Sequence, residues 1–275
     1  MRAMATRAAT IVVAILCVAV AAGCNSEETP PASSPPSAAT TSTAVYFLRD
    51  GKIAPVRRAI PQTPHPELEA VRALLEGPTA DEAADGLDTA IPEGTEVTDV
   101  SVSGGVATVD LSGAFDDGGG SESMLGRVAQ VVATVTRFDG VKRVAFELDG
   151  KKVATIGGEG VVVDPPIGRR AIEGQTPQIL IESPLPGEAV SNPVRLSGTA
   201  NVFEATVSLE VRDGTGTKLL EAFTTATSGT GTRGTFDTRL TIPSVPGTVT
   251  IIAYEASAEN GEPLHKVDVQ VTLRS

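Results

Sequence analysis

The sequence predicts an α+β domain followed by an all-β, immunoglobulin-like sandwich. Between residues 44 and 157, stretches with a helical spacing of apolar residues alternate with strand-like runs, which indicates helices on a mostly antiparallel sheet. From residue 177 to residue 275 the helical spacing disappears, and short strand-like runs are separated by Pro, Gly and Asn. Residues 158–176 keep neither period, so we interpret them as the linker between the two domains.

The N-terminal segment, residues 1–23, has the layout of a secretory signal peptide. Two arginines precede an apolar run over residues 8–20, which is shorter than a membrane-spanning helix. The run leads to Cys24 in an order that resembles a bacterial lipobox, although Ala21 stands where that motif usually has Leu. The resemblance implies that Cys24 is diacylated and anchors the chain to the extracytoplasmic face of the cell membrane. The alternatives are a signal anchor, or an ordinary signal peptide followed by an incidental cysteine.

The mature chain would have one cysteine and a strongly acidic charge. Cys17 is removed with the signal peptide, so Cys24 would have no partner for a disulfide within the chain. Loss of Arg2 and Arg7 would change the formal net charge from −12 to −14 (−12 − 2). This balance argues against nucleic-acid binding, which needs a cationic surface. Residues 24–43 are rich in Pro, Ser and Thr, which predicts a disordered spacer behind the anchor.

The α+β domain is expected to begin with a hairpin and a helix. The hairpin covers residues 44–60 and turns at the Asp-Gly pair of residues 50 and 51. Pro55 in its second strand predicts an edge strand or an irregular one, because proline lacks the N–H that a central strand donates. The helix begins at Pro66, which suits the first helical position, and ends at Gly77, which suits the left-handed conformation after the last turn.

A short helix and a second hairpin are expected next. Thr79 and Glu82 have the spacing of a capping box, which predicts a helix up to about residue 86. Strands are expected over residues 96–102 and 106–111, with a glycine-rich turn between them.

The last elements of the α+β domain are a long helix and a half-buried strand. The helix is expected from residue 121 or 123 to about residue 137. Its buried stripe would consist of Leu125, Val128, Val132 and Val135. The strand covers residues 143–148, and an Asp-Gly turn leads from it into another short strand that ends at residue 156.

Seven strands are expected in the sandwich domain. They lie near residues 178–182, 194–200, 205–213, 219–227, 234–242, 248–255 and 266–273. The sequence lacks the Trp and the disulfide of antibody domains. We therefore expect a core of aliphatic side chains together with Phe203, Phe223 and Phe236.

Several short motifs resemble those of two known domain families. The first domain resembles the sporulation and germination domain of the GerM family in Tyr46-Phe47-Leu48, Leu74-Leu75-Glu76-Gly77-Pro78-Thr79, Ala90-Ile91-Pro92-Glu93-Gly94-Thr95, Val106-Ala107-Thr108-Val109-Asp110-Leu111-Ser112 and Gln130-Val131-Val132-Ala133-Thr134. The second domain is similar to the immunoglobulin-like domain of bacterial spore germination proteins in Ile181-Glu182-Ser183-Pro184, Pro186-Gly187, Ser197-Gly198-Thr199-Ala200-Asn201-Val202-Phe203-Glu204 and Phe223-Thr224-Thr225. The first resemblance implies a non-enzymatic lipoprotein that helps to build ring-like envelope complexes or accompanies a sensor kinase. It supplies no catalytic motif, and it does not by itself imply that the organism sporulates.

Residue patterns for catalysis or metal binding are weak. His65 and His265 are the only histidines, and each is better explained as a surface residue than as a catalytic base. Neither a Gly-x-Ser-x-Gly elbow nor a His-Glu-x-x-His pair occurs. Tyr46 and Tyr254 are interpreted as strand packing. We therefore predict no catalytic residues, no metal or cofactor-binding residues, and no enzymatic activity.

Two acidic clusters leave alternatives open. Residues 116–122 are the best calcium candidate, because calcium takes clustered carboxylates on flexible loops, but a solvated loop before the long helix is the preferred interpretation. The second cluster could face a basic partner, although a solvated helix face is the preferred interpretation. It consists of Asp81, Glu82, Asp85 and Asp88.

Three functional hypotheses follow. The leading one is a cell-envelope lipoprotein, held at the membrane by Cys24, whose two domains bind other envelope proteins, with a sensor kinase or further copies of the chain as candidate partners. The second is a lipoprotein that holds a glycan or a small envelope molecule at the junction of its domains. The third is a hydrolase without a recognisable motif, which would need a concave site with convergent acids.

Overall fold

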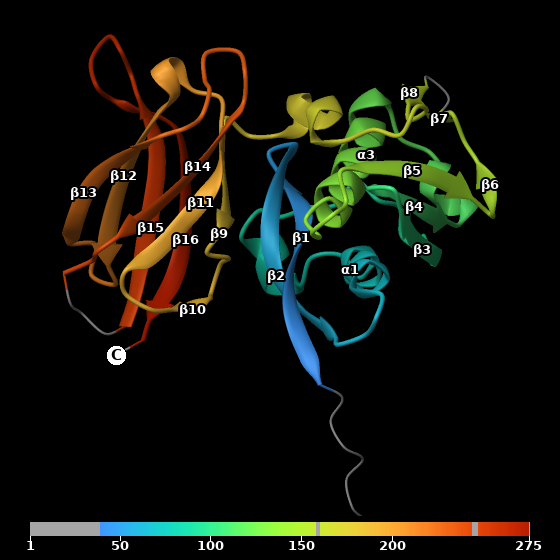
Figure 1. Cartoon of the computed structure of the whole chain (residues 1–275), viewed down its shortest axis with the longest axis horizontal. Coiled ribbons are helices and arrows are strands. Elements are labelled where there is room, and N and C mark those ends of the chain that lie inside the picture. Colours follow the sequence, from blue (N-terminus) through green and yellow to red (C-terminus); the bar gives the residue numbers. More distant parts are fainter. Residues whose placement is uncertain (1–38, 158–159, 244–246, 275) are drawn as a thin grey trace, which may run out of the picture. The chain divides into compact units, whose positions relative to one another are not determined.

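The computed structural model describes residues 39–157, 160–243 and 247–274, and these residues belong to one compact unit. The predicted signal peptide, Cys24 and the spacer up to residue 38 lie outside the described residues. Figure 1 shows an α+β fold followed by a β-sandwich, as the sequence predicts. None of the helices in the described part of the chain has the length and hydropathy that a bilayer crossing requires.

The first element is an antiparallel hairpin that contains Pro55. It consists of β1 (Thr40–Arg49) and β2 (Lys52–Pro61), which form a two-stranded sheet. The strand β1 begins four residues before the predicted start at residue 44, because residues 40–43 pair with the end of β2. Pro55 lies in β2, which has a strand neighbour on one side only, as the missing N–H of proline requires.

Two helices follow, and local capping rules account for their ends. Helix α1 (Pro66–Leu75) has Pro66 at its first position, and Gly77 has a φ of +77° after its last turn. Helix α2 (Ala80–Ala84) starts with the complete capping box: Thr79 Oγ1 accepts from the Glu82 N–H, and the Glu82 carboxylate accepts from the Thr79 N–H.

The second sheet of the α+β part contains one parallel pair. Its order is β3 (Val97–Ser103), β4 (Val106–Leu111), β5 (Arg143–Leu148) and β6 (Lys151–Lys152). Strands β4 and β5 are parallel, and the connection between them contains a 3-10 turn, η1 (Gly113–Asp116), and helix α3 (Ser121–Val135). A crossover helix is the usual way to join parallel neighbours. The other two pairings are antiparallel, so the sheet is mostly antiparallel.

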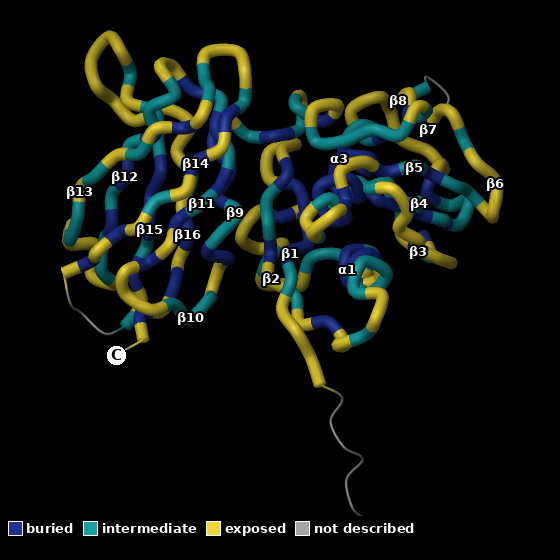
Figure 2. The backbone as a smooth tube through the Cα atoms, viewed as in Figure 1, coloured by how far each residue is buried: buried dark blue, intermediate teal, exposed yellow. Residues whose placement is uncertain are grey.

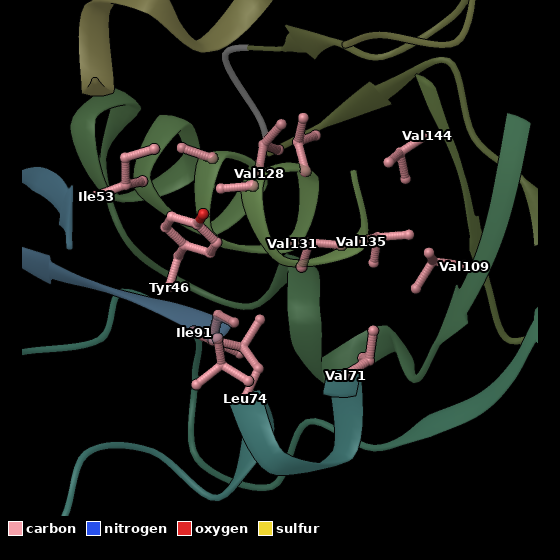
Figure 3. Close-up of a cluster of buried hydrophobic side chains, with 14 of the residues drawn as sticks. Tyr46, Ile53, Val71, Leu74, Ile91, Val109, Val128, Val131, Val135 and Val144 are labelled. Carbon is pink, nitrogen blue, oxygen red and sulfur yellow. The ribbon is translucent and has the colours of Figure 1, made fainter. Parts of the chain in front are cut away.

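Helix α3 is buried on nearly all sides rather than along one stripe. Residues 126–135 are all buried, whereas Leu125, which we predicted to be in the stripe, is only half-buried and Met124 is buried instead. The helix contacts α1, β1 and β5. Figure 2 shows which parts of the backbone are buried, and Figure 3 shows Val128, Val131 and Val135 of α3 within the cluster of buried side chains. Because elements cover several sides of α3, its apolar residues do not keep to one face.

The segment predicted as a linker packs into the α+β core. Strands β7 (Thr155–Ile156) and β8 (Val161–Val162) pair with each other. Ile167 forms a bridge with Val144 of β5, and Ile172 in the 3-10 segment η2 (Arg169–Gln175) is 2% exposed. The absence of a period therefore reflects short, irregular elements that are nevertheless fixed by burial.

Within the described residues, the sandwich contains the seven expected strands and one additional short strand. One sheet has the order β10 (Ala189–Val190), β16 (Pro263–Leu273), β15 (Gly247–Ala256), β12 (Thr206–Asp213) and β13 (Lys218–Thr225). The other sheet has the order β14 (Gly234–Leu240), β11 (Val194–Ala200) and β9 (Ile179–Ser183). Their inward residues form a separate core, mostly Val, Ile and Leu.

The aromatic part of the predicted sandwich core is wrong at two of three positions. Phe236 is buried at 3% exposure, but Phe203 and Phe223 are 50% and 71% exposed. In register, Phe223 lies opposite Ser208 of β12, on the sheet face away from the core. Phe203 lies in a three-residue 3-10 turn, η3 (Phe203–Ala205), outside the strands. Aliphatic side chains therefore fill the core with little aromatic help.

Candidate functional site

Three polar side chains of α3 are buried, and all three bind backbone groups: Arg127, Gln130 and Thr134. Thr134 Oγ1 accepts from the Tyr46 N–H at 3.1 Å, and Gln130 Nε2 donates to the Tyr46 carbonyl at 3.3 Å. These bonds pair the N–H and C=O groups of Tyr46, which lie on the edge of β1 that faces away from β2. Arg127 donates at 2.7 to 2.9 Å to the carbonyl oxygens of Ala90, Phe115 and Gly118. The need to pair buried backbone groups explains why these three polar side chains lie in the core.

A polar cluster joins the α+β part to the first strand of the sandwich. It consists of Tyr46 in β1, Arg169 in η2 and Glu182 in β9. The Glu182 carboxylate accepts from Arg169 Nη1 at 2.7 Å and from the Tyr46 hydroxyl at 3.1 Å. Arg169 also donates to Thr136 Oγ1 at 2.8 Å and to the Ala133 carbonyl at 2.9 Å, and its guanidinium lies 5.0 Å from the centre of the Tyr46 ring. All three nitrogens of this guanidinium therefore donate a hydrogen bond.

Burial governs the electrostatics of this cluster. It raises the pKa of Tyr46 to about 12, although the Arg169 charge works in the opposite direction. Burial disfavours the charged form of Arg169, but Tyr46 and Glu182 outweigh it and raise the pKa of the guanidinium. Tyr46 is therefore a neutral hydrogen-bond donor at physiological pH, and Arg169 is a fixed positive charge. Tyr46 does pack within a strand, as predicted, but its hydroxyl and the role of Arg169 were missed.

A groove of about 900 Å³ is lined by residues of three strand edges, and we call it the edge groove. Strands β2 and β9 each end their sheet at this groove. Strand β16 pairs with β10 only at Thr272 and Leu273, so its middle residues, which line the groove, have a strand neighbour on one side only. Strands that lack a neighbour present free N–H and C=O groups to an additional strand.

The edge groove has an apolar floor and a charged rim. Buried side chains of its floor include Ile53, Ile179, Ile181 and Val269. The rim carries charges of both signs, including Arg49, Lys52, Lys266, Asp85 and Asp268. The described lining residues include no Phe, Tyr or Trp. This surface suits an extended peptide with alternating apolar and charged side chains better than a sugar, which usually stacks on aromatic rings.

Within the second acidic cluster, Glu82 takes part in an ion pair and in the cap of helix α2. Both oxygens of Glu82 accept from Arg58, at 2.6 and 2.5 Å, and one also accepts from the Thr79 N–H at 2.8 Å. The hydrogen bond from Arg58 lowers the pKa of Glu82. The prediction of a solvated face is therefore wrong for Glu82, which is half-buried. The other members of the cluster are exposed: Asp81, Asp85 and Asp88.

The acidic loop and the histidines lie apart from each other. Asp116 accepts a hydrogen bond from the Gly157 N–H. In the described ranges, no three His, Cys, Asp or Glu side chains gather as a metal site would need. His65 is exposed at the start of α1. His265 lines the edge groove, with its Nε2 atom 3.7 Å from a Glu255 oxygen.

Comparisons with family models match two separate parts of the chain. Residues 44–154 match the Germane family, described as sporulation and spore germination. Residues 178–262 match the Gmad2 family, described as the immunoglobulin-like domain of bacterial spore germination. Curated proteins gave no match to this chain.

A search of solved structures matched, among others, two structures from Bacillus subtilis. The first GerMN domain of the sporulation protein GerM is 21% identical with a TM-score of 0.42, and the match covers 48% of this chain and 99% of that one. The tandem GerMN domains of the same protein are 16% identical with a TM-score of 0.43, and the match covers 74% of this chain and 62% of that one.

Proposed function

Because the chain carries a Germane domain followed by a Gmad2 domain, both of them sporulation and germination domains, we propose that it is a non-enzymatic cell-envelope module that binds other proteins. In this proposal the lipid on Cys24 holds it at the extracytoplasmic face of the membrane. Its partners are other envelope proteins, such as a sensor kinase or further copies of the chain. Nucleic acid is not among them, because the formal net charge is −12.

The observation that carries the protein-binding role is the convergence of three strand edges on one groove. An extended segment that enters the edge groove gains backbone hydrogen bonds from β2, β9 or β16, and its apolar side chains reach the buried floor. Backbone bonds provide affinity without a particular sequence, whereas the mixed charges of the rim discriminate between segments. The addition of a strand at the edge groove could therefore bind either an assembly partner or a sensor kinase.

A small envelope ligand is the second candidate, and the volume of the groove favours it. About 900 Å³ lies within the range of small-molecule sites, roughly 300 to 1,000 Å³. A small ligand would fill the apolar floor without protecting the backbone of a strand edge. Hydrogen exchange of the β2, β9 and β16 amides therefore separates the two candidates, since only an added strand slows exchange along an edge.

The test of protein binding uses the full-length chain in its own membranes with a matched pair of substitutions. Ala54→Arg places a large charge at the edge groove, and Ala114→Arg makes the same change at a half-buried alanine of η1 that does not line the groove. Crosslinking should capture the same partners with the wild type and with Ala114→Arg, and Ala54→Arg should lose them. If no reproducible protein is captured, or if Ala54→Arg captures as much as the wild type while folded by circular dichroism, protein binding at this groove is wrong.

The membrane anchor is tested separately. Intact-mass analysis should find the mature chain beginning at Cys24 with a diacylglyceryl group, and Cys24→Ala should release the protein or leave it uncleaved. A Cys24→Ala chain that is still processed and still fractionates with membranes would contradict the anchor without affecting the edge groove.

A further inference from the structure

A second groove, of about 760 Å³, is lined by three arginine side chains, and we call it the arginine groove. Arg57 comes from β2, Arg137 follows α3 and Arg274 follows β16. Three elements that are distant in sequence therefore bring positive charges to one hollow, on a chain whose formal net charge is −12. Hydroxyl groups of Ser42, Thr43 and Ser183 line the same groove.

None of these three guanidinium groups has a hydrogen-bond or ion-pair partner among the described residues, unlike several arginines nearby. Arg58 is paired with Glu82 and Arg169 with Glu182. Two acids line the arginine groove, but Glu188 accepts from the Leu185 N–H at 2.9 Å, and Asp139 is an exposed residue with no ion pair to an arginine. The acids of this groove therefore leave its arginines available to a ligand.

We propose that the arginine groove binds a phosphate group. A guanidinium presents its N–H groups in a planar fork that fits two oxygens of a phosphate or a carboxylate. Three guanidinium groups supply more charge and more donors than one carboxylate accepts. A phosphate centre carries four oxygens, of which three are terminal in a monoester and two are terminal in a diester. Ser42, Thr43 and Ser183 of the lining carry hydroxyl groups, which can donate hydrogen bonds to the remaining oxygens of such a ligand.

The phosphate has two possible sources, a phosphodiester headgroup of the membrane or a soluble phosphate ester. Residues 42–44 of β1 line the groove, so the ligand site lies where the chain enters the folded unit. The site itself is independent of the edge groove and of the lipid on Cys24, since its arginines are supplied by β2 and by the residues that follow α3 and β16.

The test is calorimetric titration of the detergent-solubilised full chain at low salt. The probes are inorganic phosphate, glycerol phosphate as a monoester, glycerophosphoglycerol as the headgroup diester, and succinate as a dicarboxylate. The test variant combines Arg57→Gln, Arg137→Gln and Arg274→Gln. The matched control combines Arg143→Gln, Arg170→Gln and Arg239→Gln, which removes the same charge from exposed arginines that lie outside the groove.

Binding of at least one phosphate probe should weaken by about tenfold or more in the test variant and by less than about twofold in the control, and added salt should weaken it further. Tighter binding of the diester than of the other probes identifies the membrane headgroup as the source, and the reverse order identifies a soluble ester. The proposal is wrong if succinate binds as tightly as every phosphate probe, if both variants lose affinity equally, or if no phosphate probe binds the wild type. Should the triple variant fail to fold, the three single substitutions take its place, and each must then weaken binding.

Discussion

Replacing Arg169 should destabilise the folded unit far more than replacing an arginine in a similar but exposed ion pair. Arg169→Met keeps most of the aliphatic stem but removes the charge that faces Glu182 at 2.7 Å. It also leaves the Ala133 carbonyl and Thr136 Oγ1 without their donor. The variant thus tests whether the segment that the sequence suggested to be a linker is a fixed part of the structure.

The magnitude follows from burial. Breaking a buried ion pair by removing one partner costs about 3 to 5 kcal/mol. The Arg169 and Glu182 side chains are 30% and 20% exposed, so solvent screens part of the uncompensated charge. We expect a loss of about 2 to 3 kcal/mol in the free energy of unfolding, which at an m-value of about 2.5 kcal/mol/M lowers the urea midpoint by about 1 M.

Urea unfolding followed by far-ultraviolet circular dichroism measures this shift, with Arg195→Met as the matched control. Arg195 pairs with Asp237 at 2.5 Å, but the two side chains are 61% and 51% exposed, so the control should leave the midpoint unchanged. Adding Glu182→Gln to Arg169→Met should recover part of the loss, because the carboxylate no longer lacks its counter-charge. Equal midpoints for Arg169→Met and Arg195→Met would show that the buried ion pair contributes no more to stability than the exposed one.

Three further predictions concern titration, backbone space and the sandwich core. Because burial raises the pKa of Tyr46 from 10.0 to about 12, its contribution to stability is complete below pH 10 and is lost as the pH rises towards 12. A Tyr254→Phe chain, which leaves Tyr46 as the remaining tyrosine, should form tyrosinate at about pH 12 when folded, and a midpoint near 10 would contradict the burial. Gly198→Ala should lower the free energy of unfolding, measured by calorimetry, by more than about 2 kcal/mol, because its Cβ would lie 2.0 Å from a carbonyl oxygen of β9. An unchanged free energy of unfolding would mean that β9 moves freely to make room. In urea unfolding, Phe236→Ala should lower the free energy of unfolding by about 3 to 5 kcal/mol. Phe223→Ala, at a position that is 71% exposed, should lower it by less than about 0.5 kcal/mol. Equal losses would mean that both rings lie in the core.

Features set by neighbouring residues could be predicted from the sequence. Pro66 and Gly77 mark the ends of α1 because proline fixes φ and glycine tolerates the left-handed region, whatever the helix packs against. The capping box of α2 is equally local. Alternating apolar residues likewise predicted the seven main strands of the sandwich, since a half-buried strand shows its period in the sequence.

Features set by tertiary partners could not be predicted. The parallel pairing of β4 with β5 depends on the path of α3 over the sheet. Phe223 and Phe236 are both phenylalanines in strands, and only the register shows that one points outward. Arg169 lies in a segment without any period, and its partners Tyr46 and Glu182 are 123 and 13 residues away, so no local pattern connects them. The lining residues of both grooves could not be predicted for the same reason, although the hypothesis of a ligand site at the domain junction concerns the region in which the edge groove lies.

The hairpin of β1 and β2 is open on one side and closed on the other, which limits how many strands it accepts. Thr134 and Gln130 occupy the backbone of β1 at Tyr46, and Asp88 occupies it at Leu48, so along residues 46–48 an added strand can pair with the hairpin only through β2. Two copies that joined through β2 would bury each other's free edges in a closed pair related by a twofold axis. The hairpin is therefore monovalent: it supports a dimer or a single recruited strand, and it cannot by itself propagate a fibre.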